Sequence, residues 1–223
     1  STATNNSSLE EYALVSFFGR VNYAFKDRYL LEANLRYDGS SRFAKDNRWG
    51  IFPSVSAGWR ISEENFWRNA RIGEVFNNLK LRASYGVLGN QNIGVYPYQQ
   101  TYDLGHNYPL GNPATLVPGT YVSTYRNPEI TWEKTAITNV GLDFGLFNNT
   151  LSGSIEYFYK YTSDILAPVE VTGIIGQSVG ESNVGAVSNK GIEVNLSYNG
   201  HIGKDFRFSI APNFTLSLIH ISE

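Results

Sequence analysis

The residues of this sequence that could perform acid–base or metal chemistry form no convergent set. His106, His201 and His220 occur singly and lack the H-E-x-x-H spacing that places two imidazoles on one metal ion. There is no Cys, which excludes thiol catalysis, disulfide frameworks and thiolate zinc sites. Glu63 and Glu64 are adjacent carboxylates at a helix-start pattern, where the helix dipole favours acids. The sequence therefore predicts no enzyme, no cofactor and no metal site.

Charged and amide side chains instead recur at alternate positions of several segments. In the stretch YLLEANLRYDG, residues 29–39, they alternate with leucine, alanine and tyrosine. Alternation with a period of two is typical of a β-strand whose two faces differ in chemistry. We therefore expect one ionic face and one apolar face on the same sheet. The ionic candidates are Glu32, Asn34, Arg36, Asp38, Lys80, Arg82 and Glu156.

About eight segments carry this alternation, and each is roughly ten residues long. Strands of soluble proteins usually span about five or six residues, whereas a tilted strand needs about nine to eleven to cross a bilayer. No window approaches the ~18 uninterrupted apolar residues of a membrane helix. Strand length therefore favours an all-β chain that crosses a membrane with strands. The alternation by itself also fits a soluble sandwich or jelly roll.

The predicted connections alternate in length, as in outer-membrane barrels, which have short periplasmic turns and long extracellular loops. Short turns are predicted at 26–28, 147–149 and 199–204, long connections at 39–49, 89–132 and 163–187, and one of intermediate length at 62–78. Aromatic residues of the apolar face fall at both ends of the strands, as expected for rings at two membrane interfaces. They are Phe25, Tyr29, Trp59, Phe144, Tyr198 and Phe206 beside the shorter connections, and Tyr37, Tyr85, Tyr159 and Tyr161 beside the longer ones.

The longest predicted connection is rich in tyrosine, with Asn and Gln interleaved. Flat aromatic faces with nearby amides suit sugar rings or peptides, and a loop of this length is uncommon without a role. The same residues could instead fold the loop on itself or against a partner lipoprotein. The candidates for ligand or partner contact are Tyr96, Tyr98, Tyr102, Tyr108, Tyr121 and Tyr125.

Charge and termini narrow the class further. The net charge is −2 and the basic residues are scattered, so no nucleic-acid partner is expected. The N-terminal stretch has no signal-peptide pattern and the chain contains no Met, so we interpret the sequence as an internal segment of a longer protein.

Four long strings resemble the SusC/RagA family of TonB-linked outer-membrane transporters of Bacteroidetes. They occupy residues 36–67 (RYDGSSRFAKDNRWGIFPSVSAGWRISEENFW), 78–102, 127–166 and 183–200, in the order of the family. The resemblance covers nearly all of residues 12–216. It implies an all-β fold, an antiparallel transmembrane β-barrel segment that supplies about eight strands of a plugged barrel of roughly 22.

The resemblance also implies function and partners. The ionic face would line a lumen filled by plug and water, and the apolar face would meet outer-membrane lipid. The transporter would import a glycan or an oligopeptide with a SusD-like surface lipoprotein. TonB would act through an amino-terminal part that this sequence does not contain. The expected localisation is the outer membrane of a Gram-negative bacterium of Bacteroidetes type.

We expect residues 1–11 to end an extracellular loop, residues 12–217 to form partial barrel wall, and residues 218–223 to be a tail foreign to the family, since SLIHISE breaks the alternation. Two alternatives stay open. A soluble secreted β-sandwich that binds glycans would fold alone as a monomer, and a secreted β-rich hydrolase would need an acid/base carboxylate pair, for which the sequence offers no candidate.

Overall fold

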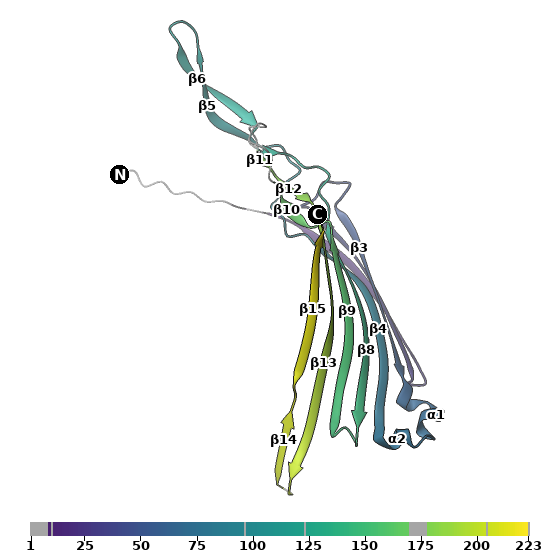
Figure 1. Cartoon of the computed structure of the whole chain (residues 1–223). Helices are drawn as coiled ribbons and strands as arrows, with labels where there is room; N and C mark the ends of the chain where they lie inside the picture. The colour runs from purple at the N-terminus through teal and green to yellow at the C-terminus, as the bar shows by residue number, and fades with distance from the viewer. Residues whose placement is uncertain are drawn as a thin grey trace.

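Long antiparallel strands in a single sheet dominate the computed structural model, which describes residues 9, 11–95, 97–122, 124–169, 178–203 and 205–222. Figure 1 shows the long strands side by side. The order is β1-β2-β3-β4-β8-β9-β13-β14, with β15 also paired to β13. The predicted all-β antiparallel wall is confirmed, and the described sheet is open. Its strands are β1 (Leu14–Phe25), β2 (Tyr29–Ser40), β3 (Trp49–Arg60), β4 (Phe76–Asn90), β8 (Glu133–Leu146), β9 (Leu151–Ser163), β13 (Ala186–Ile202), β14 (Phe206–Ile210) and β15 (Asn213–Ser222).

The last predicted strand is divided into β14 and β15. Residues 211–212 leave the ladder between them, and Pro212 keeps one link by accepting a hydrogen bond from the Leu196 amide at 3.0 Å. A proline has no N–H to donate to a ladder, which explains the interruption. β15 continues past residue 217 to Ser222, but its register places Ile219 and Ile221 on the face of Ser217. The foreign origin of residues 218–223 stays a prediction, and most of residues 1–11 lie outside the described part.

Short connections gather at one end of the sheet, at the bottom of Figure 1. The turn after β1 uses positive φ angles at Lys26 and Asp27, and the turn after β8 uses them at residues 147–149. The segment between β3 and β4 forms η1 (Ile61–Glu63), α1 (Asn65–Arg68) and α2 (Ile72–Val75). Ser62 lies inside η1, and Glu64 occupies the N-cap position of α1.

Long connections gather at the opposite end and carry small elements of their own (Figure 1). A hairpin of β5 and β6 projects beyond the sheet. β7 pairs in parallel with β11, which joins the connection after β4 to the connection after β9. Within the connection after β9, β10 pairs with β12. These elements are β5 (Tyr102–Leu110), β6 (Thr115–Val122), β7 (Thr124–Tyr125), β10 (Leu166–Pro168), β11 (Ser178–Val179) and β12 (Glu181–Asn183).

The two faces of the sheet differ as the alternation predicted. Along β2, Leu31, Ala33 and Leu35 are exposed, while Glu32 and Asn34 between them are half-buried. Aromatic rings stack on the apolar face near both ends of the strands: Tyr37 lies 4.7 Å from Trp49 at the loop end, and Tyr29 lies 6.4 Å from Trp59 at the turn end. Two such clusters match the aromatic girdles of a membrane barrel.

Aromatic rings also lie over glycines of the neighbouring strand. Gly39 pairs with Trp49, Gly191 with Phe158 and Gly200 with Phe208 in the ladder. A Cβ at any of these glycines would come within 2.7 Å of the partner's ring. Covering a strand glycine with a cross-strand ring is a known means of fixing register in sheets. In this chain it ties together residues that no local pattern connects.

A small buried core lies at the loop end, where β3 and β4 separate. Their pairing stops at Ser54 and Gly86, whereas β3 stays paired to β2 and β4 to β8. Val87 of β4 and Leu166 of the connection after β9 pack against this core. We call it the outer-rim core: Phe43, Phe52, Ile93, Ile130 and Trp132, each at most 4% exposed.

Candidate functional site

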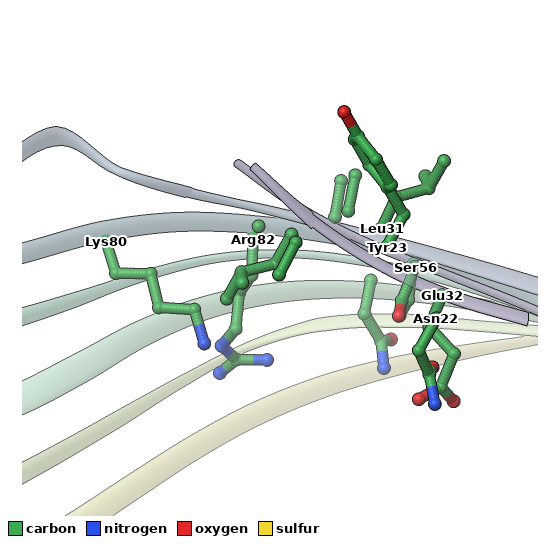
Figure 2. Close-up of a pocket in the computed structure, with 14 residues that line it drawn as sticks. Asn22, Tyr23, Leu31, Glu32, Ser56, Lys80 and Arg82 are labelled. Carbon is green, nitrogen blue, oxygen red and sulfur yellow. The ribbon is translucent and has the colours of Figure 1, made fainter. Parts of the chain in front are cut away.

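The ionic candidates come together on one face of the sheet. In Figure 2, Lys80 and Arg82 point to one side of the strands, and Tyr23 and Leu31 point to the other. The polar residues surround a hollow of about 490 Å³. Because a polar group is costly in hydrocarbon, this face suits a water-filled or protein-filled lumen. Residues that line the hollow from β1 to β8 include Asn22, Glu32, Ser56, Lys80, Arg82, Ser84 and Asn139.

Arg82 is the centre of an ionic cluster in the middle of this face. Its ladder partner is Gly141, and a Cβ there would lie 2.8 Å from the guanidinium carbon, so the arginine lies flat across the glycine. The guanidinium donates to Asp143 at 3.1 Å and to Glu156 at 2.5 Å. Glu156 in turn faces Glu193 in the ladder. Like charges directly opposite are unfavourable, so Arg82 compensates an acidic patch formed by three strands.

Replacing Arg82 by methionine leaves these acids without their cation, and we expect the full-length barrel to lose about 1–2 kcal/mol of unfolding free energy after allowance for partial solvent exposure. Arg82→Lys keeps the charge but not the two-way hydrogen bonding, so its loss should be smaller. Urea unfolding in detergent measures both. Combining Arg82→Met with Glu156→Gln should recover part of the loss; strictly additive losses would contradict the coupling.

Nearer the loop end, two further arginines are held by wall residues. Arg20 donates from Nε to Asn34 at 2.7 Å, and Asn34 donates to Glu32 at 2.9 Å. Arg36 donates from Nε to Asp38 at 2.7 Å. Asp38 is 3% exposed, and its second carboxylate oxygen has no partner in the described structure. The arginines themselves remain about half exposed or more, with side-chain exposures of 62% and 48%.

The six tyrosine candidates do not form one surface. Tyr96 lies outside the described residues, and Tyr125 is described only as backbone of β7. Tyr98 is half-buried in the loop. The remaining three, Tyr102, Tyr108 and Tyr121, lie on the β5–β6 hairpin, which does not include Tyr98.

The hairpin tyrosines are divided between two faces. The ladder between β5 and β6 shifts at Gly105, which has a φ of +104° and is skipped in the pairing. This bulge changes the alternation, so that Tyr108 shares a face with Tyr121, while Tyr102 lies on the other. Tyr102 and Tyr108 are both exposed. The hairpin therefore presents aromatic side chains on both faces.

Sequence reasoning missed the hydrogen bonds that hold the outer connections together. The Asn183 side chain accepts from the Thr131 amide at 2.8 Å and donates to the carbonyls of Thr131 at 2.9 Å and Asp164 at 2.8 Å. Asn127 donates to the Glu181 carbonyl at 3.1 Å. Trp132 donates from its indole to the Arg48 carbonyl at 3.1 Å. No sequence pattern marks these residues, because their partners lie 19 to 84 positions away along the chain.

Glu64 is a second residue whose role was missed, at the opposite end of the sheet. Its carboxylate accepts hydrogen bonds from the Tyr29 hydroxyl at 2.6 Å, the Trp59 indole at 3.1 Å and the Arg28 guanidinium at 3.1 Å. The bonds from Tyr29 and Trp59, together with the charge of Arg28, lower the pKa of Glu64 against the opposing effect of burial. Glu64 thus joins the β1–β2 turn to the β3–β4 connection, a role beyond the favourable dipole position predicted for it.

Neither a cluster of metal ligands nor a membrane-spanning helix contributes to this site in the described part of the chain. Among the described residues, no three His, Asp or Glu side chains gather in a way that could hold a metal ion. Within the same part of the chain, no helix is long and apolar enough to cross a membrane.

An open antiparallel wall, with an apolar face bounded by aromatic girdles and an ionic face opposite, defines a segment of a transmembrane β-barrel. The chain belongs to the TonB-dependent receptor family: residues 1–220 match the family described as TonB dependent receptor-like, beta-barrel. The resemblance drawn from the sequence is thereby confirmed.

Individual relatives agree with this membership. The chain is 40% identical over 211 residues to the TonB-dependent receptor SusC of Bacteroides thetaiotaomicron, covering 91% of this chain and 20% of that protein. It superimposes on the structure of the RagAB peptide transporter with a TM-score of 0.82 at 33% identity, covering 94% of this chain and 22% of that chain. The siderophore receptor PirA of Pseudomonas aeruginosa shares the fold alone, with a TM-score of 0.60 at 16% identity. The chain thus spans about a fifth of the length of SusC and RagA-type relatives.

Proposed function

We propose that this chain forms wall and outer loops of a TonB-dependent transporter that imports a glycan or an oligopeptide across the outer membrane of a Bacteroidetes-type bacterium. The two-faced wall is the observation that carries the proposal, because it separates a lipid side from a lumen side. The likeness to SusC and to the RagAB peptide transporter supports it.

A SusD-like surface lipoprotein is the proposed partner at the outer face, and the β5–β6 hairpin is its proposed contact. An isolated two-stranded hairpin is only marginally stable in water. This one exposes large apolar residues on both faces, so a protein partner would bury surface that the chain itself leaves open. The exposed residues are Tyr102, Leu104, Tyr108, Leu110, Leu116 and Val117.

The proposed source of energy is the inner-membrane proton-motive force, which TonB would transmit to the plug domain of the family rather than to the wall. In this scheme the wall forms a rigid lumen, and the outer loops capture the nutrient. The ionic residues of the lumen, Arg82 and its acids among them, would face the plug and the water around it.

The test uses cells that carry the full-length gene. Deleting the gene should abolish growth on the transported nutrient, with maltoheptaose and tryptic casein peptides as the first two probes, and deleting tonB should do the same. The protein should fractionate with the outer membrane and migrate anomalously on unboiled gels. Recovery of the protein as a soluble secreted monomer would instead favour the β-sandwich alternative.

A further inference from the structure

One part of the lumen face departs from its polar character. Near the loop end it contains a hollow of about 630 Å³ formed by β1 to β4, which we call the outer hollow. Phe18 lies opposite Arg36 in the ladder and so on the ionic side of β1, and Leu88 lies on the same side of β4. A lumen filled with water alone gives no reason for such residues. The lining side chains used below are Phe18, Arg20, Asn34, Arg36, Phe52 and Leu88.

The charges that line the outer hollow are all positive. Arg20 and Arg36 are its ionisable lining residues, whereas the carboxylate of Asp38 is buried behind Arg36 and Glu32 lines the next hollows. Glu32, which lies outside the hollow, forms a long ion pair with Arg20, at 4.0 Å between Oε1 and Nε. Each arginine is fixed at Nε by a wall acceptor, and its terminal nitrogens have no hydrogen-bond partner within the described chain. Arg36 also lies over the Phe52 ring at 5.6 Å.

Positioned guanidinium groups with free terminal nitrogens suit carboxylates, because the fork of N–H donors matches the two oxygens. Exposed apolar side chains beside them suit a ligand that carries an apolar group next to its anion. A neutral oligosaccharide supplies no anion for the arginines. An oligopeptide supplies both features, through its side chains and its terminal or acidic carboxylates.

We propose that the outer hollow binds a peptide cargo through an apolar side chain on Phe18 and Leu88 and a carboxylate on Arg20 and Arg36. This inference rests on the proposed transport function and names its cargo as peptide rather than neutral glycan. The hollow shares Phe52 with the outer-rim core and lies near the outer ends of the strands, where entering cargo arrives before it reaches the Arg82 cluster.

The experiment uses the full-length transporter, with its plug, purified in detergent. The probes are a fluorescent octapeptide containing leucine and aspartate, the same peptide with asparagine and an amidated end, and maltoheptaose. Arg36→Gln and Arg20→Gln should each weaken the acidic peptide about tenfold and leave the neutral peptide nearly unchanged. Phe18→Ser should weaken both peptides. Arg207→Gln, which removes an exposed cation at the far end of the sheet, is the matched control and should change neither.

Each other outcome overturns the assignment. Equal affinity for the acidic and neutral peptides in the wild type, or preferred binding of maltoheptaose, would remove the peptide cargo while leaving transport intact. If Arg36→Gln leaves peptide affinity unchanged but speeds proteolysis of the plug, the outer hollow contacts the plug rather than the cargo. Failure of the proposed transport function would give a different result, because deletion of tonB would then leave growth on every probe unchanged.

Discussion

Alanine at Gly89 is expected to destabilise the outer end of the wall by about 1–3 kcal/mol, the usual cost of overpacking a core. A Cβ at Gly89 would lie 2.1 Å from the tip of the Phe52 ring. The ring cannot turn aside, because it is 4% exposed, packs 5.3 Å from Trp132 and also covers Gly50. Urea unfolding of the full-length protein in detergent, followed by tryptophan fluorescence, measures the loss.

Gly19→Ala is the matched control, because it lies inside β1 and a Cβ there has no atom within 4 Å. It should be neutral or slightly stabilising, since alanine restricts the unfolded chain. Trimming the obstructing ring in the double variant Gly89→Ala, Phe52→Leu should restore part of the stability. If Gly89→Ala and Gly19→Ala behave alike, the close packing of Phe52 against β4 is wrong.

Truncation of Trp132 to alanine is expected to free the outer connections while leaving the barrel folded. The indole is 2% exposed and lies 5.1 Å from Phe43 and 5.3 Å from Phe52, so its removal costs about 3–5 kcal/mol. Four of the five outer-rim core residues lie in connections and only Phe52 lies in a strand, so most of that cost should fall on local order. Limited proteolysis should cut within 91–132 much faster, and resistance of the barrel to SDS at room temperature should persist.

Trp132→Phe separates packing from hydrogen bonding. It keeps an aromatic ring but loses the donor to the Arg48 carbonyl, worth about 1 kcal/mol, and part of the packing of the indole, so the cost should stay well below that of Trp132→Ala and loop cleavage should rise little. Loss of SDS resistance in Trp132→Ala would contradict the division into a local core and an independent wall.

The wall was largely predictable because its signal is local. A period of two puts Glu32 and Arg36 on one face of β2, and Lys80 and Arg82 on one face of β4, whatever the neighbouring strands are. The lengths of the strands and turns then indicate an antiparallel wall. The girdle was predicted in part: Tyr29, Trp59 and Tyr37 were expected at strand ends, while Trp49 was not. The short break at Pro212 was also missed, since alternation continues across it in the sequence.

The loop end was not predictable because its contacts are distant in sequence. Trp132 meets Arg48, and Asn183 meets Thr131, through geometry that the strands impose. The tyrosine hypothesis shows the same limit: residue type placed six tyrosines in one region, but the bulge at Gly105 set Tyr102 and Tyr108 on opposite faces. Whether any of them touches cargo or a partner stays a prediction.

The parallel pairing of β7 with β11 has a consequence for the exchange of loops between relatives. Asn127 reaches Glu181, and Asn183 reaches Thr131, so each long connection supplies hydrogen bonds that the other requires. Transfer of one connection alone into a relative would bring one partner of each hydrogen bond without the other. Chimaeras intended to transfer nutrient preference should therefore exchange residues 91–132 and 164–185 together. We also expect the two connections to have been inherited together as one unit.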